Sequence, residues 1–330
     1  MKNLYHKNNN ILIYGCGNVG SRHLQGALKS KYNINIFIYD KKEISIKLAK
    51  QRISEVNFNK NKISIKFLKD FKFHNNFNLV ILSTPAYKIF FILKKMIFEL
   101  NFKNLIIEKI AFQSNQEFNK SIKLLKQNNI NAWVNCANRT FNSYKKLKKI
   151  INKDDLITMI VSGGKMNFAS NLIHYLDLFS YFIYDSKFRI LLQNFNKPFK
   201  SKRKNYYEFD GYIIALSSKG DHLLVNSDIN SSRPVTVDIS TRNFNISIIE
   251  PLSKAYYMSE KNKWKIKEMN FIIENQSDLT KFLTESILKK NECDLIDVNS
   301  SFEINRMMLD IFLPHLNQSL NKNLNYCQIT

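Results

Sequence analysis

Short apolar runs alternate with segments of helical periodicity over the first 135 residues. Within the longer segments, apolar residues recur at three- and four-residue spacing, which is typical of amphipathic helices. Buried strands that alternate with such helices predict βαβ units around a parallel sheet. The predicted strands are 11–14, 34–39, 63–67, 79–82, 105–107 and 132–134, and the clearest predicted helices are 19–29, 87–100 and 117–128.

A different pattern follows residue 141. It predicts a helix at 142–151, a strand at 156–161, a turn at Gly163 and Gly164, and an amphipathic helix at 169–182. Several strand-like runs with few helices between them then predict one large, mostly antiparallel sheet that is open on one face. These runs are 188–195, 211–217, 222–229, 243–250 and 265–273, and the chain closes with predicted helices near 278–290 and 302–317.

Together the two patterns predict an α/β protein of two domains. Residues 1–135 are expected to form a Rossmann-type, doubly wound parallel sheet. Residues 136–330 are expected to form an α+β domain on the large open sheet, with packing of the C-terminal helix back on the first domain as one option. The open sheet face also predicts a homo-oligomer, a homodimer or homotetramer, formed by face-to-face packing.

The composition is that of an ordinary globular protein. Of 330 residues, 44% are hydrophobic and 23% are charged, which excludes the disordered and coiled-coil classes. The four cysteines lie far apart and form no C-x-x-C pair, so neither a zinc site nor a disulfide framework is predicted and a cytoplasmic location is expected. Residues 1–10 lack the apolar core of a secretory signal, and the most apolar stretch, 79–98, is broken by Pro85 and three lysines. No membrane span is predicted.

The net charge is strongly positive. Fifty Lys and Arg against 27 Asp and Glu leave +23, which raises the hypothesis of a nucleic-acid or other polyanion partner. The chain is also rich in Asn, Ile, Phe and Tyr, so an AT-rich genome could produce this composition without selection for charge. No helix-turn-helix, finger or aromatic-basic sheet motif is present, so the polyanion hypothesis ranks last and neither nucleic acid nor membrane is predicted as a partner.

A G-x-G-x-x-G motif occupies residues 15–20, directly after the first predicted strand and at the start of a helix. This spacing suits a dinucleotide, because Gly15 allows the tight turn, Gly17 lets the backbone approach a pyrophosphate, and Gly20 lets helix and strand pack closely. Asp40, at the end of the second predicted strand, is placed to bind both ribose hydroxyls. The sequence therefore predicts a dinucleotide site.

The helix that begins at Asn18 and Val19 would offer unpaired N–H groups and a partial positive charge to the phosphates. Asp40 favours NAD over NADP, because a carboxylate about 4 Å from a 2′-phosphate is repelled by about 4 kcal/mol at an effective dielectric constant of about 20. Lys41 and Lys42 follow directly and could bind that phosphate, so NADP is the alternative cofactor.

Further motifs occur in a fixed order along residues 11–182. Arg22 and His23 follow the glycine motif, Ser83-Thr84-Pro85 follows the fourth predicted strand, and Glu108-Lys109 follows the next one. Asn138-Arg139-Thr140-Phe141 leads into the second domain, and His174-Tyr175-Leu176-Asp177 lies in the amphipathic helix. This succession resembles the glucose-fructose oxidoreductase and inositol dehydrogenase family, usually called Gfo/Idh/MocA.

The resemblance implies an NAD(P)-dependent dehydrogenase or reductase that interconverts a hydroxyl and a ketone on a sugar, cyclitol or nucleotide sugar by hydride transfer. It places the cofactor against the glycine motif and against further residues of the first domain. Beyond Gly15, Gly17, Asn18, Val19, Gly20 and Asp40, the implied cofactor-binding residues are Arg22, Ser83, Thr84, Pro85 and Glu108.

Hydride transfer to or from a sugar carbon needs one group that moves the hydroxyl proton and another that stabilises the alkoxide. Histidine suits the first task because its pKa lies near neutrality. Lysine suits the second because an ammonium group favours the anionic oxygen. We therefore assign His174 as general acid/base and Lys109 as the electrostatic anchor, in agreement with the resemblance. A buried core histidine and a solvated strand end are the structural alternatives.

Three further polar residues are candidates for substrate binding. Asn171, one turn before His174, could hydrogen-bond a substrate hydroxyl or be an ordinary polar residue of the helix face. Asp177 could orient the imidazole or face water. Arg139 could pair with an acidic substrate, and a salt bridge at the domain junction is its simpler interpretation.

The chain also departs from the family at three positions. Ile110 stands where the family has the proline after the lysine, Ile89 where a histidine commonly follows the Thr-Pro turn, and Ser170 where an aspartate often precedes the catalytic histidine by one turn. No carboxylate then holds a cation or metal at that point, and the acid/base role would rest on His174 with less help. These departures support a second hypothesis, a nucleotide-binding protein with lost or altered catalysis.

Overall fold

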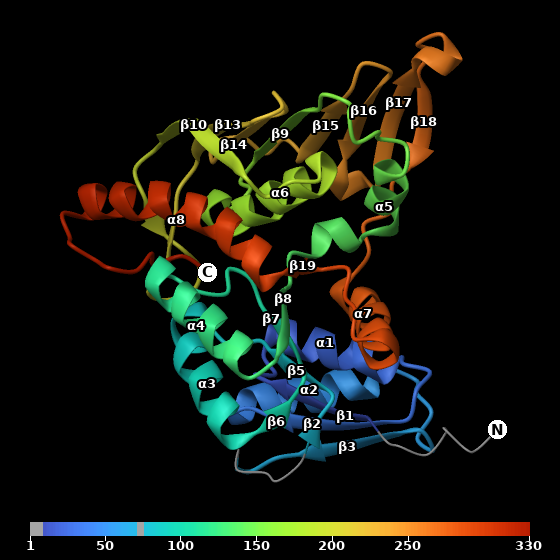
Figure 1. Cartoon of the computed structure of the whole chain (residues 1–330), viewed down its shortest axis with the longest axis vertical. Coiled ribbons are helices and arrows are strands. Elements are labelled where there is room, and N and C mark those ends of the chain that lie inside the picture. The colour runs from blue at the N-terminus through green and yellow to red at the C-terminus, as the bar shows by residue number, and fades with distance from the viewer. Residues whose placement is uncertain (1–8, 71–75) are drawn as a thin grey trace. The chain divides into compact units, whose positions relative to one another are not determined.

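A computed structural model describes residues 9–70 and 76–330 (Figure 1). Its contacts divide the chain into two compact units. Unit 1 holds the described residues up to Phe112 together with Gln116–Ala137 and Glu274–Asn299, and unit 2 holds Gln113–Asn115, Asn138–Ile273 and Ser300–Thr330. Across the described ranges, no helix has the length and apolar character needed to cross a membrane. Residues 1–8, which belong to the segment predicted not to be a secretory signal, lie outside the described residues.

Unit 1 is built on a seven-stranded sheet in the order β19-β8-β7-β5-β1-β2-β3. All neighbours are parallel except β19 and β8. The central strands are buried on both faces, because helices cover both sides of the sheet. The predicted doubly wound parallel sheet is confirmed. The strands are β1 (Asn9–Tyr14), β2 (Ile34–Tyr39), β3 (Ile63–Phe67), β5 (Leu79–Leu82), β7 (Asn104–Ile107), β8 (Asn131–Val134) and β19 (Ile296–Asp297).

The helices of unit 1 include one that comes from the C-terminal third of the chain. This helix, α7, packs against α1 and contributes Leu283 and Ile287 to the core beneath the sheet. Gly26 of α1 permits this packing, because a Cβ at that position would lie 2.5 Å from the Cβ of Thr280. The helices are α1 (Asn18–Leu28), α2 (Glu43–Ser54), α3 (Ala86–Glu99), α4 (Asn115–Gln127) and α7 (Gln276–Lys290), and two short strands, β4 (Asn76–Phe77) and β6 (Asn101–Phe102), pair beside them.

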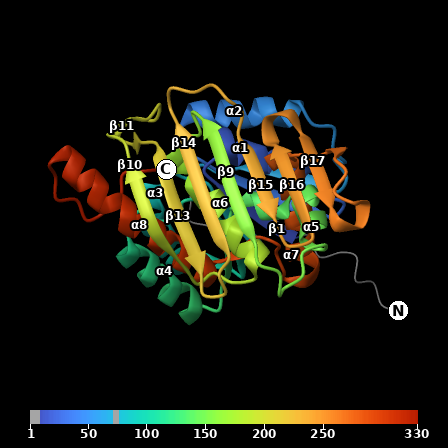
Figure 2. The ribbon, with the colours of Figure 1, turned by 90° about the horizontal axis from the view of Figure 1, so that it is seen from above.

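Unit 2 is built on an eight-stranded sheet in the order β10-β13-β14-β9-β15-β16-β17-β18, which is antiparallel except where β14 meets β9. Figure 2 shows these strands side by side above α6 (Phe168–Ile183). Because α6 covers only one face, burial alternates along the strands. The predicted large, mostly antiparallel open sheet is confirmed. The strands are β9 (Thr158–Gly164), β10 (Phe188–Phe195), β13 (Gly211–Ser217), β14 (His222–Asp228), β15 (Thr236–Ser240), β16 (Phe244–Ile249), β17 (Lys254–Ser259) and β18 (Lys267–Asn270).

The predicted turn at Gly163 and Gly164 is wrong. Both glycines end β9 and pair with Ser227 and Asp228 of β14. A Cβ on Gly164 would lie 2.1 Å from the carbonyl oxygen of Ser231. Glycine is therefore needed because the loop after β14 crosses close above the strand end, a contact that the local sequence does not reveal.

The periodicity of the sequence did not predict several of the elements, among them α2, β15 and β17. The last helix is also longer than predicted and contains Pro314. The elements not yet described are the helices α5 (Asn142–Lys148) and α8 (Val298–Leu320), the paired strands β11 (Phe199–Lys200) and β12 (Tyr207–Glu208), and the 3-10 helices η1 (Ala137–Thr140), η2 (Glu250–Leu252) and η3 (Glu260–Asn262).

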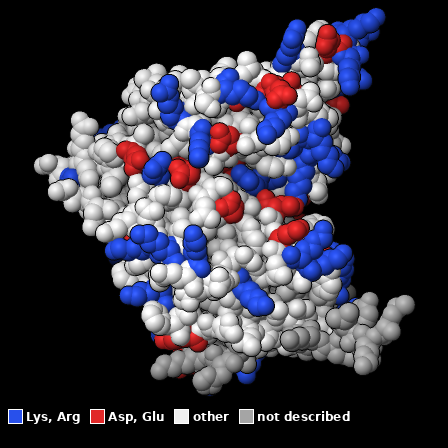
Figure 3. Space-filling view, in the orientation of Figure 1, with Lys and Arg blue, Asp and Glu red and all other residues white. Residues whose placement is uncertain are grey.

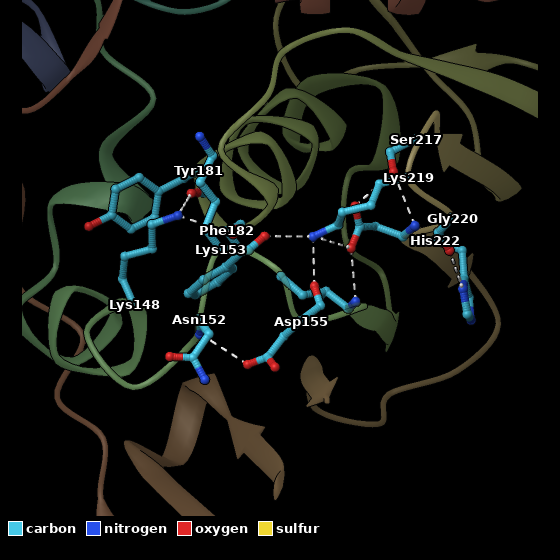
Figure 4. A network of polar contacts seen from close by, with 12 residues as sticks. Lys148, Asn152, Lys153, Asp155, Tyr181, Phe182, Ser217, Lys219, Gly220 and His222 are labelled. Carbon is cyan, nitrogen blue, oxygen red and sulfur yellow. Dashed lines mark hydrogen bonds and ion pairs between the residues drawn. The ribbon is translucent and has the colours of Figure 1, made fainter. Parts of the chain in front are cut away.

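The C-terminal end of α6 is held by a buried lysine of α5 (Figure 4). The Lys148 Nζ donates hydrogen bonds to the carbonyl oxygens of Tyr181 and Phe182, at 3.1 Å from the latter. Its pKa is lowered from 10.5 to about 7, mainly because the amine is buried and further because Arg139 and Lys219 carry positive charge nearby. In the same network, Lys219 binds the carbonyl oxygens of Lys153 and Asp155.

A folded-state pKa below the unfolded value means that the folded protein binds fewer protons than the unfolded chain between about pH 7 and 10. The free energy of unfolding should therefore rise as the pH increases from 7 to 9, by at most about 1.4 kcal/mol per pH unit for one proton. Lys148→Met should remove this component, and Lys146→Met, at an exposed site of the same helix, should retain it. Urea titrations at pH 7, 8 and 9 measure the slopes, and parallel slopes for wild type and Lys148→Met would contradict the expectation.

Candidate active site

The predicted cofactor residues of unit 1 gather where the strand order of its sheet reverses. Strands β2 and β3 lie on one side of β1, and β5, β7 and β8 lie on the other. In open α/β sheets, ligands bind at the carboxyl ends of the strands at such a reversal. The glycine motif follows β1 and Ser83-Thr84-Pro85 follows β5, so both predicted cofactor turns lie at this point.

The three glycines of the motif differ in what surrounds them. Gly15 has a φ of +89°, and a Cβ there would lie 2.6 Å from the carbonyl oxygen of Ser83. A Cβ on Gly20 would lie 1.9 Å from the carbonyl oxygen of Gly15. A Cβ on Gly17 would meet nothing within 4 Å. Gly15 and Gly20 are therefore required by the protein itself, whereas the space beside Gly17 is open at the N-terminus of α1, where Asn18 and Val19 begin the helix.

Asp40 is fixed beside the same turn. One carboxylate oxygen accepts the Cys16 N–H at 2.8 Å, and the other accepts the Lys42 N–H at 2.8 Å. Each oxygen keeps a further lone pair for a hydroxyl donor. The side chain is partly exposed, so the structure joins the predicted ribose-binding carboxylate to the predicted phosphate-binding turn.

The turn after β5 contacts the glycine motif directly. The Ser83 hydroxyl donates to the carbonyl oxygen of Gly15 at 2.6 Å, and Pro85 is the N-cap of α3. Within the described residues, the Thr84 hydroxyl oxygen is buried and has no hydrogen-bond partner. An unsatisfied buried hydroxyl beside an open glycine turn is consistent with a polar ligand at this edge.

Glu108 and Arg22, two further predicted cofactor residues, bind protein partners. The Glu108 Oε1 lies 2.6 Å from the His23 Nε2 and accepts a hydrogen bond of 2.6 Å from Asn135. The other His23 nitrogen lies 2.8 Å from the hydroxyl of Thr280 in α7. The Arg22 guanidinium donates to Gln25 at 2.7 Å.

His23, which is fully buried, was not predicted as a site residue. The only sequence signal for it is its place directly after Arg22 behind the glycine motif. Lys109 follows Glu108 and is partly exposed, and the peptide bond between Lys109 and Ile110 is cis. The His23 contacts therefore fix the end of β7 from which Lys109 extends.

In unit 2, α6 carries the candidate acid/base His174, which is partly exposed. The Asn171 side-chain amide donates to the carbonyl oxygen of Met166 at 2.7 Å. Ser170, four residues before His174, donates through its hydroxyl to Glu208 of β12 and through its N–H to the same carboxylate at 3.3 Å. The structure therefore brings a carboxylate to the helix position where the sequence has none.

Arg139 and Asp177, both predicted substrate residues, bind each other. The guanidinium lies 2.7 Å and 2.9 Å from the two carboxylate oxygens and donates to the Asp177 carbonyl oxygen at 3.2 Å. Burial raises the pKa of Asp177 to about 6, although the charge and hydrogen bond of Arg139 lower it. The pair ties η1 to α6 inside unit 2.

Surface charge and metal-ligating side chains indicate no further site among the described residues. On the face drawn in Figure 3, Lys and Arg are scattered among Asp, Glu and uncharged residues and do not gather into one stripe. Among the described residues, no group of three or more His, Cys, Asp or Glu side chains could hold a metal ion.

Known proteins match the chain in structure but not in sequence. No protein-family model matches it, and no curated protein sequence does. The UDP-N-acetylglucosamine 3-dehydrogenase GnnA from Acidithiobacillus ferrooxidans is similar with a TM-score of 0.67 and 10% identity, over 92% of this chain and 97% of GnnA.

Two other solved structures are similar to the same extent. An oxidoreductase from Agrobacterium radiobacter, in complex with NAD+, L-tartaric acid and magnesium, has a TM-score of 0.69 and 12% identity over 92% of this chain and 94% of its own. The 3-ketoreductase KijD10 from Actinomadura kijaniata, in complex with NADP and TDP-benzene, has a TM-score of 0.68 and 7% identity over 92% and 96%. The chain has the fold of these oxidoreductases. The fold implied by the resemblance to Gfo/Idh/MocA is thereby confirmed.

The contrast between Gly17 and Gly20 gives a test of the phosphate site. Gly17→Ala should leave the unfolding midpoint unchanged and weaken NADH binding at least tenfold, because the new methyl group occupies open space that a pyrophosphate would need. Gly20→Ala should instead lower the free energy of unfolding by about 1–3 kcal/mol, because its Cβ overlaps the Gly15 carbonyl. Calorimetry with NADH and urea unfolding measure both effects, and undiminished NADH affinity in Gly17→Ala would argue against the site.

Proposed function

We propose that this protein is an NAD(P)-dependent oxidoreductase that interconverts a hydroxyl and a ketone on a sugar, cyclitol or nucleotide sugar by hydride transfer. The observation that carries the proposal is the turn at the reversal of the unit 1 sheet. At this turn, the space beside Gly17 is open, the Asp40 carboxylate is held by a backbone N–H, and the Thr84 hydroxyl is buried. A dinucleotide site needs such open space for the pyrophosphate and a carboxylate for the ribose. The similar solved structures that contain NAD+ or NADP support it.

The cofactor is proposed to be NAD, with NADP as the alternative. Asp40 accepts two backbone N–H groups, and its carboxylate lies beside the glycine turn, where the ribose of a dinucleotide would lie. A 2′-phosphate at that place would be repelled, whereas the two ribose hydroxyls would donate to it. Lys41 and Lys42 are exposed beside it and are the residues that could accommodate NADP.

The catalytic roles are proposed from chemistry and from the family motifs together. Lys109 would stabilise the alkoxide through its ammonium group, and His174 would accept or return the hydroxyl proton. Arg139, Asn171 and Asp177 are proposed to shape the substrate side of unit 2. The bound cofactor would accept the hydride in the oxidation and supply it in the reduction, and these residues position the substrate and move its proton.

A nucleotide sugar is the proposed substrate class within this group. Two of the similar structures are a dehydrogenase of UDP-N-acetylglucosamine and a ketoreductase bound to a TDP derivative. The net charge of +23 would favour a substrate that carries a diphosphate.

The alternative is nucleotide binding without turnover. Ile89 and Ile110 are both fully buried apolar residues, so neither supplies a group that transfers protons. This alternative gives the same affinity for NADH and no hydride transfer with any sugar, which separates it from the proposed function.

The catalytic assignment predicts that Lys109→Ala and His174→Ala each reduce turnover at least tenfold while NADH binding stays intact. Lys103→Ala and His222→Ala, at exposed positions of the same two units, serve as matched controls and should keep wild-type turnover. NADH formation or consumption with a panel of nucleotide sugars measures the rates. Unchanged turnover in both Lys109→Ala and His174→Ala would remove the assigned roles.

We also propose that the protein is a homodimer or homotetramer that packs through the open face of the unit 2 sheet. Apolar residues on the side away from α6 remain partly exposed, including Ile160 and Tyr256, each 38% exposed. Light scattering at micromolar concentration should give a mass of two or four chains. A monomer, or an oligomer that persists unchanged in Ile160→Lys, would refute packing through this face.

A further inference from the structure

A buried carboxylate lies against the first turn of α6 and comes from a distant strand. Glu208 of β12 is 3% exposed. Its two carboxylate oxygens accept the hydroxyl and the N–H of Ser170, the latter at 3.3 Å. Ser170 lies in the first turn of α6, whose N-cap Asn167 makes no side-chain capping bond and whose first turn contains no acidic residue. Glu208 thus brings an acidic group from a distant strand to this turn.

The Glu208 carboxylate is hydrogen-bonded where it is buried. A buried charge is costly unless it is hydrogen-bonded, and here a hydroxyl and an amide N–H bind it. The N-terminus of α6 adds a partial positive potential. The two Ser170 donors are a hydroxyl and a backbone N–H, and each binds a different oxygen of the carboxylate. Asp177, the carboxylate on α6 itself, is paired with the Arg139 guanidinium.

The helix places this charge next to the candidate acid/base. Ser170 and His174 are four residues apart in α6 and therefore lie on the same face, with Cβ atoms about 5–6 Å apart. The Glu208 carboxylate, bound to the Ser170 hydroxyl, lies at the N-terminal side of His174. A negative charge at this range favours the protonated imidazole.

We propose that Glu208 is a positioning residue for His174 and that Ser170 holds its carboxylate one helical turn before the imidazole. The inference rests on the proposed function, in which His174 accepts the hydroxyl proton. When it does so, the imidazolium that forms is stabilised by the Glu208 charge. Ser170 is short enough to leave room for the longer glutamate, and an aspartate in its place would set two carboxylates side by side.

If the carboxylate acts by its charge, it should act from position 170 as well as from position 208. Glu208→Gln keeps the shape and removes the charge, so turnover should fall at least fivefold while the KM for substrate and the affinity for NADH change less than twofold. Ser170→Asp combined with Glu208→Gln returns one carboxylate to the same turn and should recover at least half of the turnover. Glu260→Gln, at an exposed position of unit 2, is the matched control.

A titration without substrate separates this inference from the proposed function. The imidazole pKa of His174, followed by NMR and assigned with His174→Ala, should fall by about one unit in Glu208→Gln and return in the double variant. The other ionisable side chains of α6 are Tyr175, Tyr181 and the Asp177 that pairs with Arg139, and they are common to all variants.

An unchanged His174 pKa in Glu208→Gln overturns the role of Glu208, whatever the turnover. Equal losses in Glu208→Gln and in the double variant, accompanied by a lower unfolding midpoint, assign Glu208 to helix capping alone and also overturn it. Absence of turnover in the wild type refutes the proposed function, and the NMR titration still decides whether Glu208 acts on His174.

Discussion

The close contact of α1 with the end of β1 is the constraint on which unit 1 depends. Gly20 leaves no room for a Cβ beside the Gly15 carbonyl, so strand and helix meet backbone to backbone. This fixes where α1 begins and therefore where the rest of its residues lie. Its N–H groups open beside Gly17, His23 reaches Glu108 at the end of β7, and Gly26 meets α7. One steric requirement thereby fixes both the glycine turn proposed to bind phosphate and the strand end that carries Lys109.

In unit 2, ionisable side chains from other elements bind both ends of α6. The partial charges of a helix favour anions at its N-terminus and cations at its C-terminus. In α6, Glu208 binds at the first turn and Lys148 binds the carbonyl oxygens of the last. Burial lowers the pKa of Lys148 to about 7, so this amine holds the helix end by hydrogen bonds that its neutral form can also donate. The helix that presents His174 is thus fixed from both ends by residues of other elements.

The sequence was sufficient for the elements whose periodicity is strong. Strands β2, β3, β5, β10 and β13 have the predicted bounds, because short runs rich in large apolar residues indicate strands without knowledge of the rest of the fold. The positions of the glycine motif and Asp40 were also predictable, since each directly follows a predicted strand and the two strands, β1 and β2, are parallel neighbours. In contrast, α2 has a weakly amphipathic sequence rich in lysine, and β15 and β17 are short and partly polar. Gly163 and Gly164 were misassigned because their need for glycine comes from the loop at Ser231.

The parts of the site that the sequence did not reveal are contacts between residues far apart in the chain. In the sequence, Ser170 stands where the family often has an aspartate, so a carboxylate is missing there. Only the fold shows that Glu208, 38 positions later, brings a carboxylate to the same helical turn. The same holds for His23 and Thr280, which are 257 positions apart. A fold fixes the place of a charge in space, and more than one chain position can fill that place. In this chain, the residue at one motif position therefore does not by itself show whether a carboxylate lies at the first turn of α6.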